Sequence, residues 1–149
     1  MKHSAGIALI YEDKLLLVHP SKARWSKMYG IPKGGIEEGE SEFKAAIRET
    51  KEEIGFAVDK KKLKKSEQKS FFYLNKKGKK TKKITFFEYI VDENELSDLG
   101  MTPEKLVVPK EKLQLSEVDW AGFISKPNLV SKLLPNQFQI VELLSSLKY

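Results

Sequence analysis

The sequence predicts a mixed α/β fold, built as one domain over residues 1–149. The length suits a single domain, and a hydrophobic content of 40 % is enough for a packed core. Short apolar runs rich in β-branched residues, bounded by turn residues, indicate strands. One stretch in the middle of the chain instead repeats apolar residues at helical spacing. Strands and at least one long amphipathic helix must therefore share a core.

The first expected element is a β-hairpin. Ser4–Tyr11 is an apolar, partly β-branched run typical of a buried strand, and Lys14–His19 is a second one. The acidic pair between them, Glu12 and Asp13, provides the turn. The histidine at the end of the second run has two interpretations, a phosphate contact or a satisfied strand-end side chain, and we favour the second.

A helix is expected next, beginning after Ser41 as the N-cap and ending before Gly55 at the C′ position. One face of this helix carries an apolar stripe at i, i+4, i+7 and i+11, formed by Phe43, Ile47, Thr50 and Ile54.

The other face of the same helix carries Glu49, Glu52 and Glu53. Their spacing places them within about 100° of arc, and like charges at this spacing destabilise a helix by roughly 0.2–0.5 kcal/mol per pair. The cluster therefore predicts a neutralising partner, and a hard divalent cation such as Mg²⁺ prefers such oxygen ligands. The alternative is a surface helix with solvated glutamates.

Beyond the helix, Ser70–Leu74 and Ile84–Val91 are expected strands, joined by a lysine-rich turn over Asn75–Lys83. The turn is either a charged tip that contacts nothing, which we favour, or a basic lip over a polyphosphate or RNA. Within the later strand, Glu88 lies on the solvent face or in a cleft. The polar stretch Asp92–Lys112 is expected to be a long connection.

Two helices are expected from Ser125 to the end, the second with Pro135 at its first position. Its apolar residues are expected to pack inward at helical spacing, namely Phe138, Val141, Leu144 and Leu147.

The stretch Gly34–Phe56 matches a long motif as a whole. Five residues separate its first glycine from Glu40, seven more precede Arg48-Glu49, and two more precede Glu52-Glu53 with Ile-Gly-Phe after them. This pattern resembles the box of the Nudix hydrolases at every fixed position. Thr50 stands where that family usually has an aliphatic residue, and its β-branched shape and volume are similar.

The resemblance implies a Nudix-type α/β/α sandwich with a mixed β-sheet and a catalytic loop-helix-loop. It also implies hydrolysis of a diphosphate linkage in a nucleoside diphosphate joined to another moiety, with Mg²⁺ or Mn²⁺ as cofactor. By position, the metal ligands are Glu49, Glu52 and Glu53, with the carbonyl near Gly34. Glu40 pairs with Arg48 and holds the loop to the helix.

Further site residues follow from the same likeness. A Pro-Lys-Gly loop resembles that of members acting on dinucleoside polyphosphates, diphosphoinositol phosphates or RNA 5′ ends. It assigns Lys33, Arg24 and Trp25 to substrate binding, with a core role as the alternative for the tryptophan. Residues 115–124 resemble a family segment in which an acid precedes a strand, so Glu117, ahead of Asp119, is an extra carboxylate. The general base is Glu53, Glu52 or Glu117.

Three functions remain open, in decreasing order of preference. The first is a pyrophosphohydrolase of a dinucleoside polyphosphate or related nucleotide. The second is the same chemistry on a triphosphorylated RNA 5′ end or a diphosphoinositol polyphosphate. The third is a nucleotide-binding module without catalysis, which the complete set of box glutamates disfavours.

Composition limits the partners and the compartment. The net charge of +6 tolerates polyanions, but a chain with only two arginines lacks the residue that sequence-reading nucleic-acid surfaces use most. The chain has no cysteine, which excludes disulfides and thiolate metal sites. Neither a signal peptide nor a membrane-length apolar run is visible, so we expect a cytoplasmic protein without a membrane partner.

Overall fold

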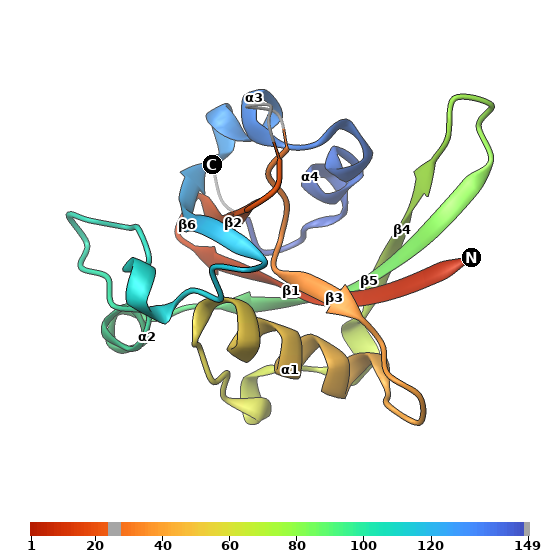
Figure 1. The fold of residues 1–149 in the computed structure, drawn as a ribbon. Coiled ribbons are helices and arrows are strands. Elements are labelled where there is room, and N and C mark those ends of the chain that lie inside the picture. The colour runs from red at the N-terminus through yellow and green to blue at the C-terminus, as the bar shows by residue number, and fades with distance from the viewer. Residues whose placement is uncertain (24–27, 148–149) are drawn as a thin grey trace.

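A mixed β-sheet forms the centre of the molecule (Figure 1). The computed structural model describes residues 1–23 and 28–147, and within them six strands pair in one sheet of order β4-β5-β1-β2-β6, with β3 added beside β1. Strands β1 and β5 run parallel, and the other pairs are antiparallel. The strands are β1 Lys2–Tyr11, β2 Lys14–Pro20, β3 Lys33–Gly35, β4 Lys69–Leu74, β5 Lys80–Ile90 and β6 Val118–Ser125.

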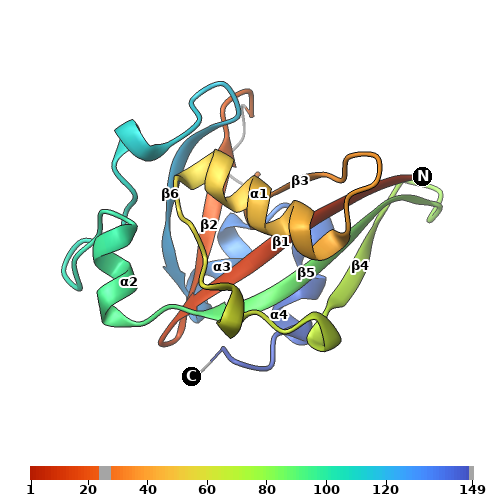
Figure 2. The same cartoon turned by 90° about the horizontal axis from the view of Figure 1, so that it is seen from below.

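Helices cover both faces of this sheet, which confirms the predicted α/β/α sandwich. Helix α1 crosses one face, and the short helices α3 and α4 lie over the other (Figures 1 and 2). None of the helices in the described part of the chain is long and apolar enough to cross a membrane. The helices are α1 Glu42–Ile54, α2 Glu93–Asp98, α3 Leu129–Lys132 and α4 Gln139–Leu143.

Strand β1 supplies both hydrophobic cores, which explains why its sequence is a continuous apolar run. Ile7 and Leu9 face the core under α1, while Ala8 and Ile10 face the core under α3 and α4. All four side chains are buried because neighbouring residues of a strand point to opposite faces.

Helix α1 has the caps that the sequence predicts. The Ser41 side chain accepts a hydrogen bond from the Lys44 backbone N–H, and Gly55 ends the helix in the left-handed conformation at φ 66°. Thr50 and Ile54 are fully buried, so the apolar stripe packs on the sheet and the glutamate face turns toward β3 and the cavity described below.

Other segments differ from the expectation. The predicted connection 92–112 contains helix α2, begun by a capping box in which Asp92 and Glu95 bond each other's backbone N–H groups. The last helix ends at Leu143, and the side chain of Phe138, predicted to be inward, is 36 % exposed. Strand β5 begins at Lys80 rather than Ile84, because its lysines pair with β4 in a projecting hairpin.

The outer edge of the sheet at β4 is closed by side chains from the C-terminal segment. Asn136 accepts from the Leu74 N–H at 3.1 Å and donates to the Leu74 carbonyl at 3.4 Å. Gln139 Nε2 donates to the Phe72 carbonyl at 3.0 Å. Backbone groups that a neighbouring strand would otherwise pair are thus satisfied within the chain.

Candidate active site

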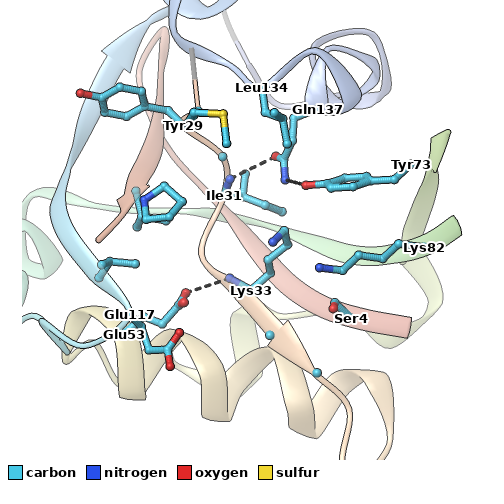
Figure 3. A pocket seen from close by; sticks show the side chains of 17 residues that line it. Ser4, Tyr29, Ile31, Lys33, Glu53, Tyr73, Lys82, Glu117, Leu134 and Gln137 are labelled. Atoms are coloured by element: carbon cyan, nitrogen blue, oxygen red, sulfur yellow. Dashed lines mark hydrogen bonds between the residues drawn. The ribbon is translucent and has the colours of Figure 1, made fainter. Parts of the chain in front are cut away.

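A cavity of about 310 Å³ opens where α1, the strand β3 and the hairpin β4–β5 meet the C-terminal segment (Figure 3). Carboxylates lie at one end of it and lysine ammonium groups at the other. Its polar lining consists of Ser4, Tyr29, Lys33, Glu53, Tyr73, Lys82, Glu117 and Gln137.

Glu53 lies at the acidic end and is 8 % exposed. Its Oε1 accepts a hydrogen bond of 2.9 Å from the Lys33 backbone N–H. Burial raises the pKa of Glu53 to about 8, and the nearby charges of Glu49 and Glu117 act in the same direction, while Lys33 opposes them. The ionised form of this side chain is therefore poorly compensated in the protein alone.

Gly34 lies where the side chain of Glu49 on α1 meets the loop before the helix. A Cβ atom at this position would lie 2.0 Å from Cδ of Glu49, so that side chain rests against the glycine backbone. Burial also raises the pKa of Glu49, although a hydrogen bond from Arg48 opposes the shift. Loop and helix thus bring Glu49 against Gly34, which lines the cavity together with Glu53.

Arg48 connects most of the remaining box residues. It bonds both oxygens of Glu40, from Nε at 2.8 Å and from Nη2 at 2.9 Å, and Nη2 also reaches the Gly35 carbonyl at 2.9 Å. The hydrogen bonds from Arg48 lower the pKa of Glu40 to about 2. This is the arrangement expected of a pair that holds the loop to the helix.

The same guanidinium changes the electrostatic argument drawn from the sequence. Nη1 of Arg48 bonds Glu49 at 2.9 Å and Glu52 at 3.2 Å, so an arginine within the helix already neutralises part of the glutamate cluster. Part of the neutralising partner that the cluster predicts is therefore Arg48 itself. Glu53, which Arg48 does not reach among the contacts of the described residues, is where the uncompensated charge concentrates.

The donor set still fits a hard divalent cation. Glu49, Glu52 and Glu53 offer carboxylate oxygens and the loop at Gly34 offers a carbonyl, which are the ligand types that Mg²⁺ takes. The buried, poorly compensated Glu53 is the local observation in favour. Within the residues that the structure describes, no three acidic, histidine or cysteine side chains form a ready-made metal site. Glu49 and Glu52 would both have to exchange their bonds to Arg48 for the metal.

The basic end of the cavity contains residues that sequence reasoning missed. Lys82 Nζ lies 5.4 Å from the centroid of the Tyr73 ring, and Lys33 Nζ lies 6.0 Å from it. Burial and the proximity of Lys33 lower the pKa of Lys82 to about 8. Alternation gives a signal for Lys82 only once β5 is known to begin at Lys80, because Lys82 then shares a face with the buried Ile84.

The remaining residues that the sequence singled out have three different outcomes. Glu117 lines the cavity, near enough to raise the pKa of Glu53. Arg24 and Trp25 lie outside the described residues. His19 is bonded to Asp119 at 2.8 Å and packs against Tyr29, which agrees with the satisfied strand-end interpretation.

Comparisons with known proteins agree with this architecture. A family model described as the NUDIX domain matches residues 1–124. No curated protein sequence matches the chain. An Ap4A hydrolase from C. elegans, solved as a binary complex, superposes with a TM-score of 0.63 at 19 % identity, covering 96 % of this chain and 92 % of that one.

Two further solved structures are similar. The NUDIX domain of NrtR from Shewanella oneidensis, crystallised with ADP ribose, has a TM-score of 0.64 at 15 % identity, covering 96 % of this chain and 85 % of that one. A bifunctional NMN adenylyltransferase/ADP ribose pyrophosphatase from Francisella tularensis, complexed with AMP and a Mn ion, has a TM-score of 0.61 at 18 % identity. The match covers 95 % of this chain and 40 % of that one. At these identities the structures support the fold.

Proposed function

The chain belongs to the Nudix family of hydrolases, and from this premise we propose that it cleaves a diphosphate linkage in a nucleotide, most suitably a dinucleoside polyphosphate. One observation carries the proposal. A single cavity has the carboxylates Glu53 and Glu117 at one end and the ammonium groups of Lys33 and Lys82 at the other. An elongated polyphosphate fits such a site because its length can bridge the two ends.

The basic end binds the phosphates that are not cleaved. Lys33 and Lys82 act as point charges for phosphate oxygens. Because burial lowers the pKa of Lys82 to about 8, an arriving polyanion also favours its protonated form. These contacts place one end of the substrate and leave the scissile linkage near the carboxylates.

The acidic end carries out the chemistry. Glu49, Glu52 and Glu53, with the carbonyl at Gly34, would hold Mg²⁺ or Mn²⁺, which when bound supplies charge neutralisation and Lewis-acid activation of water. Glu53 is our first choice of general base and takes the proton of the attacking water. Glu117, which also lines this end of the cavity, and Glu52, which precedes Glu53 on α1, are the other candidates. Arg48 and Glu40 keep loop and helix in register.

A substrate panel tests the proposal. Purified protein is incubated with diadenosine tetraphosphate, ADP ribose and a triphosphorylated RNA oligonucleotide, each with Mg²⁺, with Mn²⁺ and with EDTA, and released nucleotide and phosphate are measured. We expect metal-dependent release of nucleotide, fastest from the dinucleotide. Activity that persists in EDTA, or no release from any substrate, contradicts the proposal.

A second candidate substrate is the 5′ end of RNA, favoured by one observation. The β4–β5 turn exposes Lys76, Lys77 and Lys79 on the same hairpin whose Lys82 lines the cavity. A polyanion extending from the cavity could run along this hairpin. An RNA substrate predicts cleavage that falls steeply with salt and depends on these exposed lysines, whereas cleavage of the dinucleotide should not depend on them.

A further inference from the structure

The hydrogen-bond orientation of Gln137 is determined by its neighbours. Its side chain is 1 % exposed, and the Ile31 backbone N–H donates to Oε1 at 3.2 Å. A backbone N–H can only donate, so the amide oxygen must face Ile31 and the amide nitrogen must face the other partner. That partner is the Tyr73 hydroxyl, to which Nε2 donates at 2.8 Å (Figure 3).

This orientation assigns a direction to the hydroxyl of Tyr73. Its oxygen accepts from Gln137, so its own proton is available for a different acceptor. Among the contacts of the described residues, the Tyr73 hydroxyl donates to no protein group. Tyr73 and Gln137 both line the cavity, so the proton of this hydroxyl is available to a ligand there.

The neighbouring polar groups have the same character. Lys33 and Lys82 lie beside the Tyr73 ring, and an ammonium group can only donate. We propose that Gln137 is a positioning residue that fixes Tyr73 as a hydrogen-bond donor, so that Tyr73, Lys33 and Lys82 together favour a ligand rich in acceptor oxygens, such as phosphate. The choice of a phosphate ligand rests on the proposed function, whereas the assignment of Tyr73 as a hydrogen-bond donor rests on its contact with Gln137 alone.

Gln137 packs against the loop before β3, and backbone hydrogen bonds hold its segment to that loop. A Cβ atom on Gly30 would lie 2.8 Å from the Gln137 amide, so the glycine makes room for it. The Leu134 N–H donates to the Tyr29 carbonyl at 2.9 Å, and the Tyr29 N–H donates to the Lys132 carbonyl at 3.1 Å. Gln137 thus lies after the family-matched residues, whereas its partners Ile31 and Tyr73 lie within them.

Gln137→Glu is the variant that reverses the hydrogen bond between residue 137 and the Tyr73 hydroxyl with little change in shape. A carboxylate can still accept from the Ile31 N–H, but it must also accept from the Tyr73 hydroxyl, whose proton then turns away from the cavity. Tyr73→Phe removes the donor altogether. Gln139→Glu is the matched control, because it adds the same charge beside β4 at a residue that bonds Phe72 and not Tyr73.

The probe is inorganic phosphate, which the enzyme cannot hydrolyse, titrated into protein carrying ¹³C at the tyrosine Cζ position with Mg²⁺ present. The Tyr73 resonance is identified by its absence in Tyr73→Phe. We expect it to shift on titration of the wild type and of Gln139→Glu, and to stay unchanged in Gln137→Glu. Phosphate affinity should fall roughly ten-fold in Gln137→Glu and in Tyr73→Phe, and no further in the double variant.

Two results would overturn the inference. One is wild-type phosphate affinity in Tyr73→Phe, a variant that leaves the segment packing intact. The other is an equal loss of affinity on adding Gln137→Glu to the Tyr73→Phe background, which would show an effect that bypasses the hydroxyl. Failure of the proposed function looks different: phosphate would still move the Tyr73 resonance, but no nucleotide would be cleaved.

Discussion

Glu53 is buried and Glu88 is half-buried, one on each side of the sheet, and they differ in what surrounds them. Glu88 lies under the C-terminal segment, where it accepts hydrogen bonds from Lys69 Nζ at 2.8 Å, from Ser145 Oγ at 2.7 Å and from the backbone N–H groups of Ser145 and Ser146. Glu53 accepts one, from the Lys33 N–H. The sequence left two positions open for Glu88, the solvent face or a cleft, and the structure has it half-buried against residues 145 and 146.

These surroundings shift the pKa values of Glu53 and Glu88 in opposite directions. Burial raises the pKa of both carboxyls, but at Glu88 the hydrogen bonds from Lys69 and Ser145 outweigh burial, and the pKa falls below its usual value. At Glu53 burial prevails and the pKa rises to about 8. Lysines show the same contrast, because Lys69 bonds Glu88 whereas burial and Lys33 lower the pKa of Lys82 to about 8. The charge of Glu88 is compensated within the chain, whereas the charges of Glu53 and Lys82 in the cavity are compensated poorly.

The largest expected effect comes from Glu53→Gln. We expect turnover to fall by roughly 10²–10⁴-fold, because the proton acceptor is lost, while the melting temperature stays equal or rises, because a poorly compensated carboxyl is removed. Turnover is measured on the best substrate of the panel, and melting by circular dichroism. Unchanged turnover would refute the assigned role.

Glu88→Gln should show the reverse pattern. The variant leaves Lys69 with a weakened partner and cannot satisfy all of the donors, so we expect the free energy of unfolding to fall by roughly 3 kcal/mol with turnover close to wild type. Denaturant unfolding measures the loss. A catalytic defect in folded Glu88→Gln that equals that of Glu53→Gln would remove the distinction between the two glutamates.

Substituting the two lysines sharpens the comparison on the cationic side. Lys82→Met should raise KM about ten-fold with little change in stability, since a phosphate contact is lost. Lys69→Met should lower stability and leave KM unchanged, because its ammonium serves Glu88. Steady-state kinetics and thermal melts on both proteins provide the check, and equal KM values would contradict it.

The smallest effect concerns pH, measured in EDTA. The raised pKa of Glu53 contributes stability that is complete below its ordinary value of 4.5 and is lost as the pH rises through about 8. The lowered pKa of Glu88 contributes stability that is complete above 4.5 and is lost as the pH falls through its folded value. Glu53→Gln should therefore flatten the melting profile by a few degrees on the alkaline side, and Glu88→Gln on the acid side.

The local chemistry of the fold was predictable from the sequence. Ser41, Gly55 and the apolar stripe define α1, and the apolar runs locate most strands, because caps and side-chain periodicity act over short distances. Helix α2 was missed although its signal was present, since Asp92 and Glu95 have the spacing of a capping box.

Long-range partners were not predictable. Lys82 appears in the sequence as one lysine among many, and its burial depends on where β5 begins. Gln137 belongs to no motif and reaches Ile31 and Tyr73 only through the packing of the C-terminal segment. Arg48 was assigned to Glu40, but its further bonds to Glu49 and Glu52 depend on side-chain conformation. The box motif predicted the residues at the acidic end of the cavity, but it contains no residue of the basic end.

The amide side chains that close β4 have a consequence for how the protein behaves in a crowded cell. The side chains of Asn136 and Gln139 bond backbone groups of β4 to which a strand of a second molecule could otherwise bond. Loss of the last turns, by proteolysis or by a premature stop codon, would expose the edge of β4 to pairing with a strand of another molecule. Such shortened chains should accumulate as aggregates before their catalytic defect could be noticed.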